Sequence, residues 1–345
     1  MEPLKISRFL HNPIRLEATL ELPRIASTWC RMPRSLPSWD AALTELEPFS
    51  RATLVVTDID GTLVMPEARD VGQSISDVQR RLRRYRKNQV VLTVATGRTL
   101  AGVQPILNAL ELRRGTPMIL YNGSVIVTYL EEHLLLRKII PIEICNRILD
   151  RCWRTRATVR TYTIYDDHVD SPLEPLREQV RGWGLQAKEP NQMPVIDLPV
   201  GRPYDDIVGP SAILISLDRD GSSSGDRLRA FLARLSEVTV TSSGSSFLEI
   251  RPAGSNKGAA LAVLTAHLGV ALQNTIAIGD NDNDAELLAT AGIGVVVSGS
   301  SAGASTAADY VCRLGAAKGT LEVLRLIKES RRYFPSAKSK REEVL

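Results

Sequence analysis

Two aspartates that follow a short apolar run are the first residues able to do chemistry. Asp58 and Asp60 come after Leu54-Val55-Val56 and are separated by one residue. Residues two apart on an extended backbone point to the same side, so both carboxylates would face one pocket, and Gly61 would permit a sharp turn after them. For an isolated Asp-x-Asp-Gly, a turn capped by aspartate is an equally good interpretation.

Three further polar segments could hold a phosphate group or a metal ion. Thr96-Gly97-Arg98 follows a second apolar run, where a hydroxyl, backbone N–H groups and a helix start can bind phosphate oxygens. Lys257 opens a helical pattern and can reach a phosphoryl group. The loop 279–284 contains three aspartates after another apolar run. Singly, the first two segments are better explained by a plain helix cap and a solvent-facing lysine.

The donor types of these segments favour a hard cation. Only oxygen ligands are available, because the histidines show no ligand spacing and the cysteines form no C-x-x-C pair. Mg²⁺ prefers a few carboxylates together with water and substrate phosphate, whereas the loop 279–284 lacks the spacing of a calcium-binding EF-hand. The sequence therefore predicts Mg²⁺ as the cofactor.

The elements that would position these residues alternate between strand and helix. The predicted strands are 54–56, 90–95, 118–121, 275–278 and 294–297, and the predicted helices are 75–85, 100–112, 257–268 and 284–290. Between them lie expected helices 143–153 and 226–235 and expected strands 159–165, 212–217 and 247–250. The alternation predicts an α/β fold, a doubly wound and mostly parallel Rossmann-like core sheet with an inserted small α/β cap domain.

This pattern divides the chain into four parts. Residues 1–50 are an N-terminal extension of unknown role, in which a helix would start with Ser38 as its cap. Residues 51–126 and 252–330 form the core, 127–251 the inserted cap, and 331–345 a charged tail. An insertion at the carboxyl end of a strand overlooks the ligand crevice of the sheet, so it can act as a lid that selects the substrate.

The four polar segments in this order, each after a strand or at a helix start, resemble the haloacid dehalogenase superfamily. Tyr121-Asn122-Gly123, Phe247-Leu248-Glu249-Ile250 before Lys257, and the loop 279–284 look like the Cof-type and sucrose-phosphatase-like branch with a C2-type cap. The resemblance covers about residues 53–327. One departure is Ser298-Gly299-Ser300-Ser301, where the family usually has a Gly-Asn-Ala turn, which puts contacts at that turn in question.

The resemblance implies a role for each motif residue. Asp58 would be the nucleophile, and Asp60 the acid that protonates the leaving alcohol and then the base that activates water. Asp58, the main-chain carbonyl of Asp60 and Asp280 would bind Mg²⁺, with Asp284 acting from outside. The residues that would hold the phosphoryl oxygens are Thr96, Gly97, Lys257 and Asn283. The expected substrate contacts are Arg98, Asn122, Arg160, Tyr162 and Tyr165, although packing explains the alternation of the last three equally well.

Three functions remain open from the sequence. The first is a Mg²⁺-dependent phosphatase that acts on a small phosphorylated metabolite, above all a sugar phosphate, through an aspartyl-phosphate intermediate. The second is a phosphomutase or phosphotransferase that returns the phosphoryl group to a sugar phosphate. The third is a binding module without catalysis that senses phosphate.

Composition narrows the possible partners and the cellular location of the protein. The 43 basic against 39 acidic residues leave a net charge of +4, too small a surplus over 345 residues to require a nucleic acid partner. The basic cluster 80–87 lacks interleaved aromatic residues, so a solvated helix face is the favoured interpretation. No signal peptide or membrane-spanning run is visible, and we expect a cytoplasmic protein with reduced cysteines, either a monomer or a homodimer.

Overall fold

The structure is a computed structural model. It describes residues 32–38, 41–65, 75–80, 83, 90–166, 176–183, 193–199, 201, 203–217, 223–243 and 247–334. Most of the extension 1–50, the tail beyond Phe334, Cys30 and most of the basic cluster 80–87 lie outside this range. Within it, no helix is both long and apolar enough to cross a membrane.

The core is a six-stranded sheet in which every neighbouring pair of strands is parallel. Its strands, in spatial order, are β1 (Arg34–Ser35), β15 (Tyr310–Val311), β14 (Ile293–Val296), β13 (Thr275–Gly279), β2 (Leu54–Thr57) and β3 (Val91–Val94). The central strands β2 and β13 are buried along their whole length, which explains their continuous apolar sequences. The predicted doubly wound α/β fold is confirmed.

Helices cover both faces of this sheet because successive strand residues point to opposite sides. Val55 packs with α1 (Leu43–Ser50), α3 (Leu100–Leu110) and α9 (Ala316–Tyr333), whereas Leu54 and Val56 pack with the helices of the other face. Those helices are α6 (Lys257–Leu268), α7 (Ala285–Thr290) and α8 (Ala302–Ala307). Two apolar layers therefore fix the strand ends that carry the polar loops.

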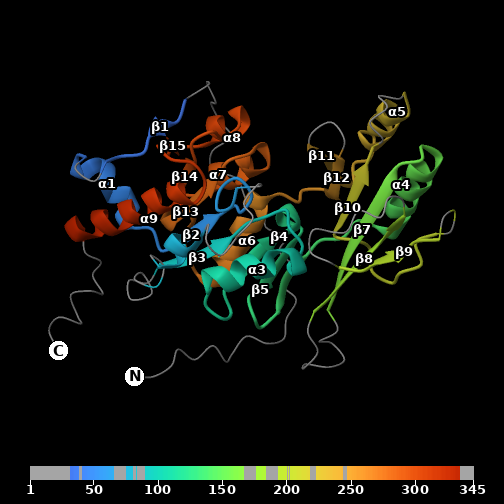
Figure 1. Ribbon diagram of the computed structural model, residues 1–345, viewed down its shortest axis with the longest axis horizontal. Coiled ribbons are helices and arrows are strands. Elements are labelled where there is room, and N and C mark those ends of the chain that lie inside the picture. The colour runs from blue at the N-terminus through green and yellow to red at the C-terminus, as the bar shows by residue number, and fades with distance from the viewer. Residues whose placement is uncertain are drawn as a thin grey trace.

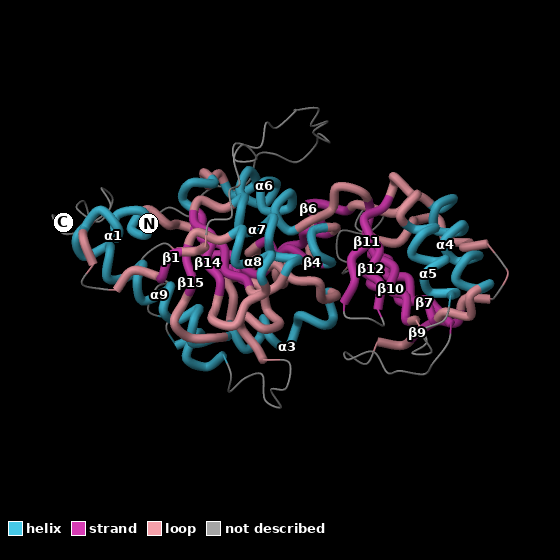
Figure 2. The backbone as a smooth tube through the Cα atoms, turned by 90° about the horizontal axis from the view of Figure 1, so that it is seen from above, coloured by secondary structure: helices cyan, strands magenta, loops and turns pink. Residues whose placement is uncertain are grey.

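A second six-stranded sheet, which with its two helices we call the insert, stands beside the core (Figure 1). Its strands are β11 (Val238–Ser243), β12 (Phe247–Pro252), β10 (Ala212–Ser216), β7 (Thr158–Tyr165), β8 (Arg177–Trp183) and β9 (Val195–Asp197). Helices α4 (Ile142–Arg154) and α5 (Ser223–Leu232) lie on the side of this sheet away from the core (Figure 2). The other side of the sheet is therefore turned toward the core.

The expected boundary between residues 126 and 127 is wrong. It falls inside β5 (Val125–Thr128), which pairs with β4 (Pro117–Leu120) and β6 (Leu134–Arg137) in a small antiparallel sheet. A parallel bridge from Ala95 to Ile119 joins this sheet to the end of β3. The chain therefore leaves the core only after β6.

The N-terminal segment also differs from the expectation. The helix expected from Ser38 begins instead after Ala42, whose side chain makes no capping hydrogen bond. Before it, β1 pairs with β15 and brings Leu36 into the main apolar core, so that Ser38 follows a strand rather than starting a helix. Phe49 of α1 is fully buried and packs on Tyr310, with ring centroids 5.4 Å apart. This part of the extension is built into the core.

Candidate active site

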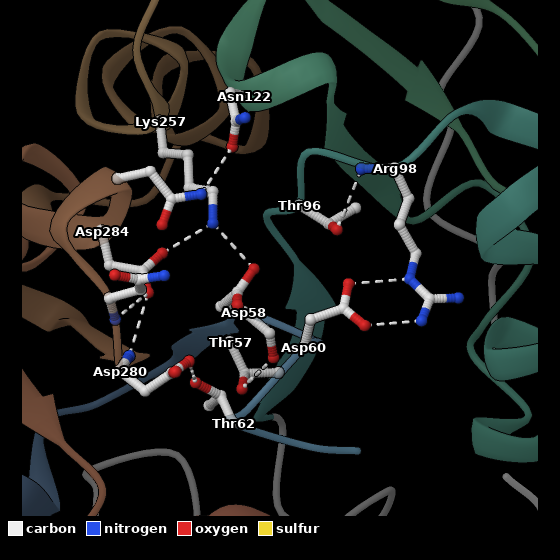
Figure 3. Close-up of polar contacts among 12 residues, drawn as sticks. Thr57, Asp58, Asp60, Thr62, Thr96, Arg98, Asn122, Lys257, Asp280 and Asp284 are labelled. Atoms are coloured by element: carbon white, nitrogen blue, oxygen red, sulfur yellow. Dashed lines mark hydrogen bonds and ion pairs between the residues drawn. The ribbon is translucent and has the colours of Figure 1, made fainter. Parts of the chain in front are cut away.

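The polar segments meet at one edge of the core sheet because the strands before them are parallel. Asp58 follows β2, Thr96 follows β3 and Asp280 follows β13, all at carboxyl ends of neighbouring strands. Lys257, the first residue of α6, reaches the same place (Figure 3). Open α/β sheets bind their ligands at this edge.

A buried lysine lies among three carboxylates. Asp58, Asp280 and Asp284 each offer an oxygen within 4.8 Å of the others. The Nζ of Lys257 lies 2.7 Å from Oδ1 of Asp58 and 2.6 Å from Oδ1 of Asp284, and Lys257 has no exposed surface. One positive charge therefore faces three acidic groups, and the excess favours a cation.

Burial determines the electrostatics of this cluster. Loss of hydration raises the pKa of Asp58 to about 8, although the charge of Lys257 acts in the opposite direction. Burial also raises the pKa of Asp280, against a hydrogen bond from Thr62. For Lys257, burial alone would lower the pKa, but the charges of Asp58 and Asp284 outweigh it and raise the value. Lys257 therefore compensates the burial of Asp58 and Asp280 only in part, as expected of a cation site.

Both carboxylate oxygens of Asp284 already accept hydrogen bonds within the protein. Its Oδ2 accepts hydrogen bonds from the backbone N–H groups of Asp280, at 2.9 Å, and Asn281, at 3.1 Å. Its Oδ1 accepts the bond from Lys257. The carboxylate thereby holds the loop 279–284 in shape, which leaves Asp58 and Asp280 as the better direct ligands.

Asp60 is held by Arg98. Two nitrogens of the guanidinium lie 2.8 and 2.6 Å from the two carboxylate oxygens, and Arg98 also donates to the carbonyl of Gly102 at 3.1 Å. Figure 3 shows the Asp60 carboxylate turned toward Arg98, away from Lys257. Its side chain is 47% exposed, so unlike Asp58 it can exchange partners and reach a ligand.

The segment 96–98 forms a tight loop against Asn122. The Thr96 hydroxyl accepts a hydrogen bond from the backbone N–H of Arg98 at 3.1 Å. A Cβ on Gly97 would lie 2.8 Å from Nδ2 of Asn122, so a larger residue there would have to displace this amide. Asn122 has a left-handed backbone with φ of 50° and accepts a hydrogen bond from Asn283 at 3.1 Å. Thr96, Gly97, Asn122 and Asn283 are thus brought together.

The remaining sequence candidates lie on the insert. Arg160 and Tyr162 of β7 are two residues apart, so they share the face of the sheet on which Tyr162 packs against Tyr121, with ring centroids 6.0 Å apart. Tyr165 falls on the opposite face, where it contacts Asp206 and Gln179. It does not point toward the candidate site.

Two glutamates near the site were not predicted as functional. Nδ2 of Asn122 donates to both carboxylate oxygens of Glu249, at 2.9 Å each, and Glu178 binds the start of α3. Glu249 belongs to the segment 247–250 that indicated the family, so the sequence could have pointed to it. Glu178 has no local signal, because its partners lie in the core and are distant in the sequence.

The turn 298–301 keeps contact with the acidic loop despite its departure from the family pattern. Ser301 donates its N–H to the carbonyl of Asp280 at 2.8 Å and its hydroxyl to Asp282 at 2.6 Å. The same side chain caps α8 by accepting from the N–H of Ala304. Ser301 therefore ties this turn to the acidic loop.

Gly61 is expected to be essential for the geometry of the acidic cluster. Its φ is +87°, and an added Cβ would lie 2.2 Å from Oδ2 of Asp280. Gly61→Ala should therefore push Asp280 out of place and cost about 1–3 kcal/mol of folding stability through backbone strain. Differential scanning calorimetry and metal titration check this, with Gly299→Ala as control, since that glycine has φ of +89° but open space around it. Unchanged metal affinity in Gly61→Ala would contradict the expectation.

Known proteins with similar sequences are hydrolases and phosphatases. The family model of haloacid dehalogenase-like hydrolases matches residues 55–324. The HMP-PP phosphatase of Shigella flexneri serotype 5b (strain 8401) is 31% identical over 249 residues, which cover 71% of this chain and 84% of the relative. The HMP-PP phosphatase of Escherichia coli (strain K12 / DH10B) is 30% identical over 248 residues, with coverages of 71% and 84%.

Solved structures share the fold. A haloacid dehalogenase-like hydrolase from Bacteroides thetaiotaomicron superposes with a TM-score of 0.64 at 23% identity, covering 80% of this chain and 99% of that one. A sugar phosphatase of subclass IIB of the superfamily gives 0.58 at 17% identity, covering 81% and 98%. Together with the family match, these findings show that the chain belongs to the haloacid dehalogenase-like hydrolases, in the Cof-type branch that its motifs indicated.

Proposed function

We propose that the protein is a Mg²⁺-dependent phosphatase that hydrolyses a small phosphorylated metabolite through a phosphoaspartate at Asp58. The observation that carries the proposal is the buried cluster of Asp58, Asp280 and Asp284 around Lys257, beside the loop 96–98. A carboxylate, a lysine and a loop of backbone N–H groups are the parts that phosphoryl transfer through a covalent aspartate needs.

The cluster fits a Mg²⁺ ion. Asp58 and Asp280 would supply carboxylate oxygens and Asp60 its main-chain carbonyl, while Asp284 orients the loop through its bonds to the N–H groups of Asp280 and Asn281. Bound there, Mg²⁺ would neutralise negative charge on the substrate and keep Asp58 ionised.

Asp58 acts as the nucleophile in this proposal. An ionised carboxylate attacks phosphorus without prior loss of a proton, and forming an aspartyl phosphate divides one difficult displacement into two easier ones. An ammonium group has three N–H donors, and Lys257 uses two of them on Asp58 and Asp284. We assign the third to a phosphoryl oxygen, with the Thr96 hydroxyl and the Gly97 N–H binding the others.

Asp60 acts as acid and then as base. It protonates the leaving alcohol oxygen and later takes a proton from the attacking water. Since both of its oxygens are bound to Arg98, it must exchange at least one of these bonds for the substrate. Arg98 would then be released to contact the leaving group.

The insert serves as the cap that selects the substrate. Its core-facing side brings Glu178, Glu249, Arg160 and Tyr162 toward the loop 96–98 and Asn122. These polar side chains suit a compact leaving group with several hydroxyls, such as a sugar. The related HMP-PP phosphatases and the sugar phosphatase of the same fold make HMP-PP and hexose phosphates the first substrates to assay.

The test is a screen of phosphorylated metabolites with Mg²⁺ in which released phosphate and remaining substrate are both measured. A phosphatase releases one phosphate for each substrate consumed. Isomerised sugar phosphate without free phosphate would show a phosphomutase instead. No turnover of any compound, with Asp58→Asn behaving as wild type in every binding assay, would contradict a catalytic role.

Binding of Mg²⁺ should strengthen as pH rises from 6 to 8. The raised pKa of Asp58, about 8, means that the folded metal-free protein holds a proton there that the unfolded chain has lost above pH 3.8. The metal-free protein therefore loses stability as pH rises through this window, whereas Mg²⁺ binds only the ionised form. The affinity should fall about tenfold per pH unit below 8, and the rise in melting temperature with Mg²⁺ should be larger at pH 8 than at pH 6. A rise that is independent of pH would contradict this.

A further inference from the structure

Arg98 holds Asp60 with the edge of its guanidinium group that suits a bidentate anion. Its Nε and Nη2 lie 2.8 and 2.6 Å from the two oxygens of the Asp60 carboxylate. A separate nitrogen, Nη1, donates to the carbonyl of Gly102 in the first turn of α3 at 3.1 Å. The contact with Gly102 does not depend on Asp60, so it keeps the guanidinium in place when the aspartate turns to the substrate.

This turn leaves a cation without its anion. Asp60 is the acid and then the base of the proposed mechanism, so at the substrate it cannot keep both bonds to Arg98. The Arg98 side chain is 30% exposed, against 47% for Asp60, so water replaces the lost carboxylate only in part. Carboxylate and phosphate fit the same fork of N–H donors. An anionic group of the substrate is therefore favoured at this edge of Arg98.

The sheet of the insert turns charges of both signs toward the core. Glu249 and Arg160 both pair with Leu214, so they share a face, and Glu249 contacts Asn122 of the core. The charged residues that strand pairing places on this face are Arg160, Arg251, Glu178, Glu249 and, on the exposed edge strand, Asp197. A second anion of the substrate would meet all of these charges.

The two glutamates of this face are already bound by donors of the protein. Glu178 accepts hydrogen bonds from two N–H groups at the start of α3 and from the hydroxyl of Tyr121. Glu249 accepts from Nδ2 of Asn122, and its Oε1 lies 3.8 Å from Nε of Arg251. Their negative charge is therefore partly compensated within the protein.

The cations at the junction of core and insert have carbonyl partners instead. Arg137 donates to the carbonyl of Ile164 at 2.9 Å, and Lys138 donates to that of Gly254 at 2.8 Å. A carbonyl accepts the hydrogen bond but does not cancel the charge. Once Asp60 has turned to the substrate, the basic groups named here outnumber the acidic ones, since they are Arg98, Arg137, Lys138, Arg160 and Arg251 against Glu178, Glu249 and Asp197. A second anion is therefore attracted to this side of the site.

We propose that Arg98 binds a second anionic group of the substrate beside the leaving oxygen, and that this group displaces Asp60 from the guanidinium. The inference rests on the proposed phosphatase function. The substrate is then a phosphate ester whose leaving group is anionic next to the bond that breaks. The terminal diphosphate of an alcohol is the simplest case, because its inner phosphate stays on the leaving group, and HMP-PP is a diphosphate of this kind.

The bond changes balance with the residues already assigned. An oxygen of Asp58 bonds to the terminal phosphorus while the bond from that phosphorus to the bridging oxygen breaks, and Asp60 gives its proton to the leaving monophosphate. Water then attacks the aspartyl phosphate, passes a proton to Asp60 and releases orthophosphate. Arg98 only exchanges one anion for another, so it gains and loses no proton.

The test compares kcat/KM for the diphosphate and the monophosphate of one alcohol in the presence of Mg²⁺. The alcohol is that of the best substrate in the screen. The two leaving groups differ in reactivity, so the readout is the change in this ratio between wild type and variant. Arg98→Gln should lower the diphosphate-to-monophosphate ratio by at least about tenfold, the size of one charge-assisted contact. Arg98→Lys, which keeps the charge but loses the fork, should lower it less.

Arg154→Gln is the matched control. The Nε of Arg154 also contacts both oxygens of an aspartate, Asp150, at 3.1 and 2.9 Å, but this pair is exposed on α4. The control should leave the ratio unchanged. If Arg98→Gln leaves the ratio unchanged or raises it, Arg98 only positions Asp60 and the proposal is overturned, as it is if wild type uses the monophosphate alone. No turnover of any compound in the screen would instead remove the phosphatase function itself.

Discussion

Asp58→Asn should lower turnover of the best phosphorylated substrate by about 10⁴-fold or more, since loss of a covalent nucleophile has effects of this size. The amide keeps the shape of the side chain but cannot attack phosphorus. It also removes one of the two carboxylates that we assign to Mg²⁺, so metal affinity should fall as well. Steady-state phosphate release and calorimetric titration with Mg²⁺ check both effects.

The same substitution should leave the metal-free protein folded. Asp58 is 4% exposed, and burial of its charge is unfavourable, which its raised pKa reflects. An asparagine oxygen can still accept the hydrogen bond from Lys257, and Asp284 still balances the lysine charge. The melting temperature without Mg²⁺ should therefore stay close to the wild-type value, so that the loss of turnover reports on chemistry.

Asp282→Asn is the control for this experiment. Asp282 is an exposed aspartate of the same loop, and its oxygen accepts a hydrogen bond from Ser301. Because it is not part of the buried cluster, its replacement should change turnover by less than about threefold, as is usual for surface positions. Turnover above a few per cent of wild type in Asp58→Asn would show that another group is the nucleophile.

The convergence of the polar segments could be predicted from sequence because each depends on local pattern. A buried parallel strand is a continuous apolar run, and its polar continuation marks the carboxyl end. The runs before Asp58, Thr96 and Asp280 are of this kind, and β2, β3 and β13 are indeed neighbours in the core sheet. The helix start at Lys257 could also be predicted from local sequence, and α6 does begin at that residue.

The partners of these residues could not be predicted, because they depend on strand pairing and on how the two sheets face each other. Glu178 lies 78 positions from Leu100, and Glu249 lies 127 positions from Asn122. The sequence of β8 (Arg177–Trp183) mixes charged, polar and apolar residues without regular alternation, so neither the strand nor the direction of Glu178 was visible. Tyr165 was misplaced for a different reason: its odd separation from Tyr162, which the sequence does show, puts it on the other face of the strand.

Lys257→Met should destabilise the metal-free protein by about 3–5 kcal/mol, the usual cost of removing one partner from a buried ion pair. Methionine fills similar space but leaves Asp58 and Asp284 without positive charge in a site where Lys257 has no exposed surface. Chemical denaturation at constant pH measures the free energy of unfolding. Lys318→Met, at an exposed lysine of α9, should change it by less than about 0.5 kcal/mol.

Mg²⁺ should recover part of this lost stability, because a divalent cation between Asp58 and Asp280 compensates the same excess of negative charge. Turnover should still fall by about 10²–10³-fold even with saturating Mg²⁺, since Lys257 contacts the phosphoryl oxygens in the proposed mechanism and one preorganised charge contributes this much. The two effects therefore separate the structural role of the lysine from its catalytic one. Full recovery of turnover by Mg²⁺ would mean that Lys257 only balances the carboxylates, and the third N–H would then have no part in binding the phosphoryl group.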